Sequence, residues 1–125
     1  MKSTTILALV LGFQLAVVHI VATKLSLYWE IIWFDNLVHL FGGVVLVLLF
    51  YTFVDIKILS PKWVRSGRRS ALLVTVVLVG WEILGVMMIG RIKENFVSDT
   101  LLDVGFGILG CIIGWFIGRQ LKKLE

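Results

Sequence analysis

Five ionisable residues lie within or beside long apolar stretches of this chain, where a membrane would make them costly. They are Asp35, His39, Glu82, Asp99 and Asp103. A carboxylate at the centre of a membrane-spanning helix costs roughly 2.5–3.5 kcal/mol on insertion scales, so such a residue predicts a function. Carboxylate oxygens and imidazole nitrogens bind zinc or manganese, and they also relay protons. The chemistry that these residues indicate is metal binding or proton sharing.

The spacing of the five residues places them on shared helix faces. Asp35 and His39 are four residues apart, as are Asp99 and Asp103, so each pair lies on one face of a helix. Carboxylates crowded in a low dielectric repel one another unless they are protonated or bridged by a cation. We therefore predict that His39, Glu82 and Asp103 hold a divalent metal ion, zinc or manganese. Asp35 or Asp99 would act as a further ligand or as the catalytic general base.

The elements that must position these residues are four apolar runs. Apolar residues make up 59% of the 125 residues, and the mean hydropathy of +1.01 is typical of membrane proteins. The runs cover approximately residues 4–23, 36–54, 70–90 and 100–118. Each is about 20 residues long, which is enough to cross a ~30 Å hydrocarbon core. We predict an all-α, four-transmembrane-helix bundle, a single domain over residues 1–125, as a multi-pass protein of the cell membrane.

The distribution of basic residues predicts the orientation of the bundle. Residues 55–69 carry five Lys or Arg and one Asp, and the tail after the fourth run carries three more basic residues. Loops rich in Lys and Arg stay on the cytoplasmic side of a membrane. Both termini and residues 55–69 are therefore expected inside, with residues 24–35 and 91–99 outside. The same rule explains the net charge of +4 without a nucleic-acid partner.

The first run also allows a second interpretation, a signal peptide. Lys2 precedes an apolar stretch that ends near the small residue Ala22, as in a secretory leader. The run is longer than a typical signal core, which favours a membrane span. After it, Tyr28, Trp29 and Trp33 predict an aromatic belt at the membrane surface, on a short interfacial helix between the first two spans.

Depth in the membrane decides whether residues on different helices can share a site. Because the spans alternate in direction, Asp35 and Asp99 lie at the outer starts of two of them. His39 and Asp103 each lie about 6 Å deeper. Glu82 lies roughly 12 Å below the outer end of the third span, and its longer side chain can reach upward. All five residues are therefore expected in the outer half of the membrane, where they can meet.

Glycines follow each polar group on the same helix face. They are Gly42 and Gly43 after His39, Gly85 after Glu82, and Gly107, Gly110, Gly114 and Gly118 after Asp103. Small residues at such spacings let transmembrane helices approach closely. The glycine face is therefore predicted to be the packed face, with the ionisable side chains pointing into the bundle above it.

These polar positions resemble those of a known group of membrane proteins. The pattern is Asp35-Asn36-x-x-His39-x-x-Gly42-Gly43, then Trp81-Glu82, then Asp99-Thr100-x-x-Asp103-x-x-x-Gly107-x-x-Gly110. Over residues 35–118 the chain resembles the small integral membrane proteins of the YjdF and VanZ-like group. The resemblance implies a compact helical bundle with an outward-facing acidic and histidine cluster. It also implies a role at the cell envelope, where VanZ-like proteins are associated with glycopeptide resistance.

Three functions are compatible with this pattern. The first is hydrolysis of a membrane lipid or a lipid-linked envelope substrate by metal-activated water. The second is proton- or cation-coupled transport, which would need a homo-oligomer because four spans leave little room for a pathway. The third is a non-catalytic envelope stress or resistance protein. The chain has no H-E-x-x-H and no serine nucleophile motif, so the sequence leaves all three open.

The predicted orientation can be tested with reporter fusions. Reporters fused at Glu125 and within residues 55–69 are expected to indicate the cytoplasm, because these segments carry the excess of Lys and Arg. A reporter fused after Arg91 is expected to indicate the outside. An outside signal from residues 55–69 would invert the orientation and move the acidic cluster to the cytoplasmic side.

Overall fold

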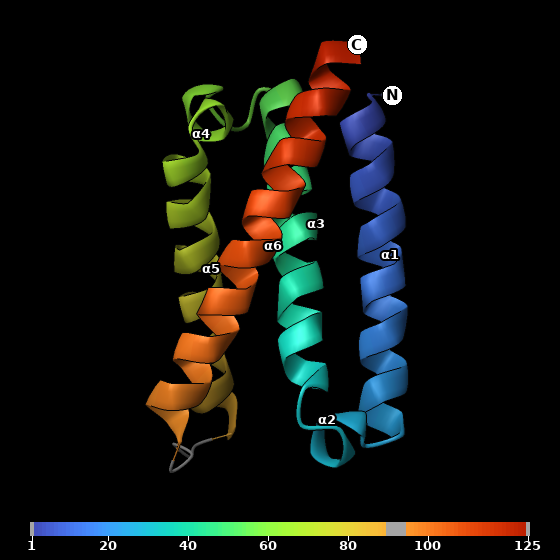
Figure 1. Ribbon diagram of the computed structural model, residues 1–125, viewed down its shortest axis with the longest axis vertical. Helices are drawn as coiled ribbons and strands as arrows, with labels where there is room; N and C mark the ends of the chain where they lie inside the picture. Colours follow the sequence, from blue (N-terminus) through green and yellow to red (C-terminus); the bar gives the residue numbers. More distant parts are fainter. Residues whose placement is uncertain (1, 90–94, 125) are drawn as a thin grey trace.

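Helices make up almost all of the computed structural model, which describes residues 2–89 and 95–124 (Figure 1). In chain order they are α1 (Ser3–Lys24), α2 (Leu27–Glu30), α3 (Phe34–Asp55), α4 (Lys62–Arg65), α5 (Gly67–Ile89) and α6 (Phe96–Leu124). No strand occurs in these two described ranges. The predicted all-α fold is confirmed.

Four of the helices, α1, α3, α5 and α6, are long and apolar enough to cross a membrane. They contain the four predicted apolar runs, apart from the end of the third run at residue 90, which lies outside the described residues. Large apolar side chains face away from the bundle, among them Phe13, Val76 and Met87, which are 72%, 61% and 74% exposed. A hydrocarbon environment removes the cost of exposing them. The chain is therefore a small polytopic membrane protein by its helices and its surface.

The long helices form a bundle in which α6 crosses the others obliquely (Figure 1). Helix α6 packs mainly against α3, while α1 lies against α3 and α5 lies against α6. The N- and C-termini lie at the same end as α4, and α2 lies at the other end (Figure 1). The bundle thus has one end with both termini and one end with the predicted interfacial helix α2. Which end faces the cytoplasm stays a prediction.

Glycines bring α3 and α6 into backbone contact. A Cβ atom at Gly110 would collide with the carbonyl oxygen of Leu40, and one at Gly43 would collide with the carbonyl oxygen of Gly107. At Gly114 a Cβ would lie 2.8 Å from the carbonyl oxygen of Val44. No larger residue fits at these positions without moving a helix, so the predicted packed glycine face is confirmed at Gly43, Gly110 and Gly114.

The prediction is wrong for Gly85 on α5, where a Cβ atom would meet nothing within 4 Å. Helix α5 instead approaches α6 through the side chain of Leu78, which fills the space above Gly107. Because Leu78 holds the two helices a side chain apart, α5 needs no small residue at this interface. Gly42 is also loosely packed, with only Leu15 at 4.0 Å.

Replacing Gly110 by Ala is expected to destabilise the bundle by about 1–3 kcal/mol, because the added methyl group forces α3 and α6 apart. The matched control is Gly105→Ala on the same helix, where a Cβ atom meets nothing within 4 Å. That change should be neutral or stabilising by up to about 1 kcal/mol, since Ala favours a helix over Gly. Thermal unfolding in detergent measures the difference. Equal effects of the two changes would show that α3 and α6 are not in backbone contact.

Candidate metal centre

Ionisable side chains from three helices meet toward the end of the bundle that carries α2. Asp35 lies in the first turn of α3, and His39 follows it one turn later. Asp103 comes from α6, and Glu82 comes from α5. Four of the five predicted site residues are therefore brought together, as their depths along the spans predict.

His39 lies at the centre of the cluster. Its Nε2 atom is 3.6 Å from Asp103 Oδ2 and 3.7 Å from Glu82 Oε1. Its Nδ1 atom is 3.9 Å from Asp35 Oδ1. These separations are longer than hydrogen bonds, which join nitrogen and oxygen at about 2.7–3.2 Å. The imidazole is thus surrounded by carboxylates that face it without bonding to it.

One side of the cluster is buried, and the other side is exposed at the surface of the bundle. The side chain of Asp103 is 7% exposed and that of His39 is 13% exposed. Glu82 is more open at 22%, and Asp35 is 44% exposed. A ligand or water molecule therefore has its access from the side of Asp35, and Asp103 forms the floor.

The donor atoms have nearly the spacing that a metal ion requires. Ligand atoms about 2.0–2.2 Å from a tetrahedral zinc ion lie roughly 3.3–3.6 Å from one another. The two distances from His39 Nε2 to the carboxylates of Glu82 and Asp103 are close to this range. A second grouping also exists, because Asp35, His39 and Asp103 offer ligand atoms that all lie within 4.8 Å of one another. His39 and Asp103 belong to both groupings, and either Glu82 or Asp35 completes them.

Two buried polar atoms beside the cluster have no hydrogen-bond partner in the described part of the chain. They are His39 Nδ1 and Thr100 Oγ1. Buried polar atoms are nearly always bonded, so two such atoms beside the same cluster indicate a missing partner. Thr100 lies three residues before Asp103, on the same face of α6. Thr100 was not among the predicted site residues, although its spacing of three residues from Asp103 places it on the same helix face.

Asp99, the other predicted catalytic residue, lies in the first turn of α6 and is exposed. No ion pair joins it to His39 within the described ranges, so its catalytic role stays a prediction. Its backbone nitrogen donates a hydrogen bond to the carbonyl oxygen of Asn95 at 2.9 Å. The structure therefore places Asp99 at the rim and Asp103 inside.

Aromatic residues hold α2 against the start of α3, next to the open side of the cluster. Tyr28 Oη lies 2.7 Å from His19 Nδ1, and the Tyr28 ring packs edge-on against Phe34 at 5.4 Å. Partial burial, together with the negative charge of Asp35, raises the pKa of Tyr28 above its usual value of 10.0. The phenol therefore stays neutral beside Asp35. The short interfacial helix predicted between the first two spans is α2.

Comparisons with known proteins identify no relative of this chain: no protein family, no curated protein and no solved structure matches it. The resemblance to the YjdF and VanZ-like group thus stays a prediction.

The missing partner of Thr100 can be tested by removing its hydroxyl. Thr100→Val should leave the melting temperature of the metal-free protein unchanged or raise it, because an unbonded buried hydroxyl destabilises the fold. The control is Ser70→Ala, since the fully buried Ser70 Oγ donates to the carbonyl oxygen of Trp63, seven residues away, at 2.8 Å. The control change should lower the melting temperature more. If Thr100→Val lowers the melting temperature more than the control does, the Thr100 hydroxyl has a hydrogen-bond partner in the metal-free protein.

Proposed function

We propose that this membrane protein binds a divalent metal ion, zinc or manganese, through His39, Glu82 and Asp103. The observation that carries the proposal is the convergence of two carboxylates from different helices on one imidazole nitrogen, at 3.6 and 3.7 Å. Zinc binds this combination of nitrogen and oxygen ligands readily. Asp35 lies on the far side of the ring, where its carboxylate can accept the Nδ1 proton and orient the imidazole.

Electrostatics supports a cation in the cluster. Two negative charges 4 Å apart repel by about 4 kcal/mol even at an effective dielectric constant of 20. The carboxylates of Asp35, Glu82 and Asp103 face a single imidazole, which offers at most one positive charge. A divalent ion would neutralise most of the remaining charge. The other solution is protonation of the carboxylates, and the experiment below distinguishes the two.

The surroundings of the cluster favour a binding site over a transport route. Along the α3–α6 interface, the described side chains beyond the cluster include Val44, Val47 and Cys111, all at most 8% exposed. Glycines in backbone contact fill the rest of that interface. A proton or cation relay needs polar groups along its whole length. The described part of the α3–α6 interface therefore offers no polar path from the cluster toward the other end of the bundle.

We extend the proposal to hydrolysis of a membrane lipid or a lipid-linked envelope substrate. A bound zinc or manganese ion lowers the pKa of a coordinated water molecule and polarises a phosphoryl or carbonyl oxygen. The proton that this water loses would go to Asp99 at the exposed rim, the other predicted catalytic residue, because Asp35 lies at the opposite nitrogen of the ring. His39 is one turn from the start of its helix, at a depth that lipid headgroups can reach. The resemblance to envelope proteins supports the same choice of substrate.

The test compares the metal content and melting temperature of purified wild-type protein with those of Glu82→Gln. The wild type should carry zinc or manganese, and a chelator should lower its melting temperature, because a bound ligand stabilises the fold. Glu82→Gln should lose most of the metal and be less stable than the wild type. Glu30→Gln, which changes an exposed glutamate on α2, should behave as the wild type does.

The opposite result would show that the cluster shares protons. In that case the wild type would purify without metal and would ignore added zinc and manganese. Glu82→Gln would then be more stable than the wild type, since it removes a repulsion. The sign of one stability change therefore separates the two hypotheses.

A further inference from the structure

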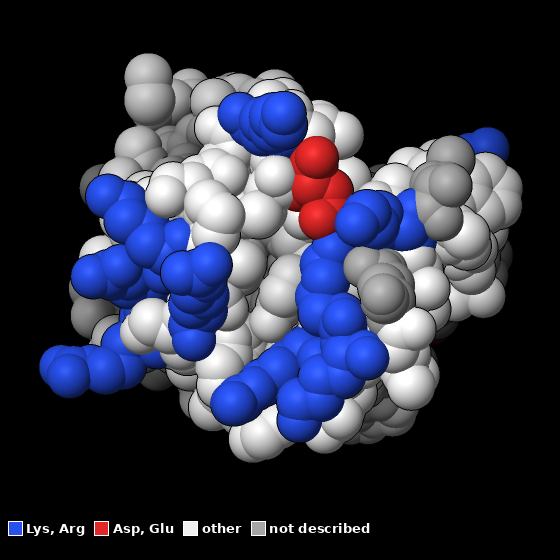
Figure 2. Space-filling view, turned by 90° about the horizontal axis from the view of Figure 1, so that it is seen from above, with Lys and Arg blue, Asp and Glu red and all other residues white. Residues whose placement is uncertain are grey.

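A second polar site lies at the end of the bundle that carries the chain termini. A pocket of about 470 Å³ is bounded there by α3, α4 and α6 and by the residue before α1. Its lining residues with a positive charge are Lys2, Arg65, Arg119 and Lys122. Figure 2 shows Lys and Arg side chains across this end, with one acidic patch among them. The pocket is separate from the His39 cluster, which lies toward the other end.

The charge of the pocket lining is unbalanced. Among the described residues that line it, Asp55 is the one carboxylate, and Lys122 Nζ contacts both carboxylate oxygens of Asp55 at 2.6 Å. Thr4 Oγ1 also donates a hydrogen bond to Asp55, at 3.5 Å. The carboxylate is therefore occupied within the protein. The remaining positive charge of the lining attracts an anion.

Contacts of Trp115 hold together the two helices that carry Arg65 and Arg119. Arg119 stacks over the ring of Trp115 at 5.3 Å, and Trp115 Nε1 donates a hydrogen bond to the carbonyl oxygen of Val64 at 2.8 Å. Val64 belongs to α4, which also carries Arg65. One indole thus links the two helices that supply the arginines. One guanidinium group can donate two parallel hydrogen bonds to a phosphate group. Side chains that are already held in place lose less conformational entropy when the ligand binds.

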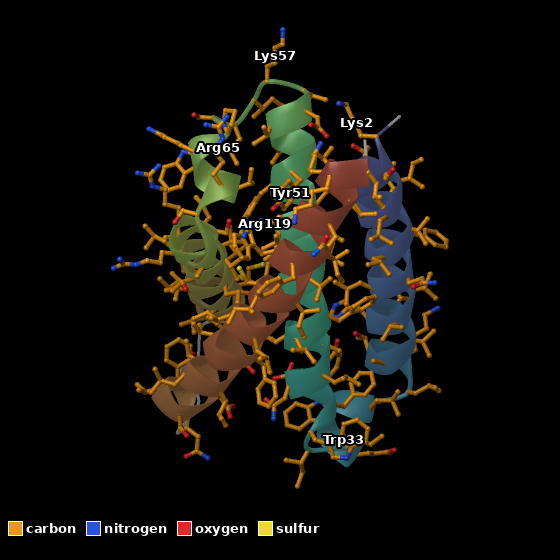
Figure 3. The ribbon with its side chains drawn as sticks, turned by 45° about the horizontal axis from the view of Figure 1, so that its top comes forward. Lys2, Trp33, Tyr51, Lys57, Arg65 and Arg119 are labelled. Atoms are coloured by element: carbon orange, nitrogen blue, oxygen red, sulfur yellow. The ribbon has the colours of Figure 1, made fainter. Side chains whose placement is uncertain are left out.

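The labelled side chains in Figure 3 show how the pocket is assembled. Lys2, Arg65 and Arg119 come from three different segments around Tyr51, whereas Lys57 extends away from the pocket (Figure 3). Tyr51 is buried, and its hydroxyl donates only a long hydrogen bond, of 3.4 Å, to the carbonyl oxygen of Trp115. Because this bond is long, the single O–H donor of Tyr51 can turn from the Trp115 carbonyl to a ligand oxygen.

We propose that this pocket binds the phosphate headgroup of an acidic phospholipid. The pocket lies at the end of four helices that cross the membrane, where lipid phosphates are the most concentrated anions. Its apolar lining residues, among them Val54, Pro61 and Val64, suit the glycerol and upper acyl carbons. Basic pockets between transmembrane helices bind such headgroups through the same combination of charge and apolar wall. This inference is independent of the metal site, because the two lie toward opposite ends.

The test measures binding of short-chain phosphatidylglycerol to the full chain in detergent, followed by melting temperature and by native mass spectrometry. Wild type should prefer phosphatidylglycerol to phosphatidylcholine. Arg65→Gln and Arg119→Gln should each weaken phosphatidylglycerol binding by roughly fivefold. Lys57→Gln removes the same charge from the same end but outside the pocket, so its affinity should match the wild type.

Three results would overturn the proposal. If Lys57→Gln and Arg65→Gln lose the same affinity, phosphatidylglycerol is attracted by the positive charge of the whole surface and does not bind in the pocket. Equal binding of phosphatidylcholine would show that charge does not select the ligand. Inorganic phosphate that reproduces the whole stabilisation at the same concentration would identify a soluble anion as the ligand. Arg119→Lys keeps the charge but loses the paired guanidinium hydrogen bonds and the Trp115 stack, so its affinity should lie between those of the wild type and Arg119→Gln.

Discussion

Backbone contact between α3 and α6 is the constraint on which the rest of the structure depends. The carbonyl oxygens of Leu40 and Gly107 occupy the space that side chains would need at Gly110 and Gly43. His39 lies one turn before Gly43, and Asp103 lies one turn before Gly107. The contact that aligns the glycines therefore also sets His39 against Asp103, at 3.6 Å. In this bundle, helix packing and the geometry of the polar cluster have a single cause.

The two ends of the bundle differ because different residues lie beyond the same apolar core. Toward the α2 end, three described carboxylates face His39, which favours a bound cation. At the other end, Lys and Arg outnumber the carboxylates among the described residues that line the pocket, which favours a bound anion. Buried apolar side chains such as Val47, Leu48 and Val74 separate them. Each end thus has its own electrostatic character, and each can be tested without disturbing the other.

Most of the fold could be predicted from the sequence, because span length and apolar character are local properties. The meeting of His39, Glu82 and Asp103 could also be predicted, since depth along alternating spans follows from residue counting. The absence of a helix contact at Gly85 could not be predicted, because it depends on which helix α5 packs against and on the size of Leu78. The unpartnered hydroxyl of Thr100 was equally out of reach, since bonding partners are defined only when helices from distant parts of the chain are in place.

The most direct test of the central claim is X-ray absorption spectroscopy at the zinc edge on protein loaded with one zinc ion per chain. The proposed ligands His39 on α3, Glu82 on α5 and Asp103 on α6 predict one imidazole and at least two carboxylate oxygens, at about 2.0–2.2 Å from the metal. His39→Ala should lose most of the bound zinc, as Glu82→Gln should, and any zinc that remains should show no imidazole contribution. A shell of water molecules alone, or a sulfur ligand from Cys111, would contradict the account.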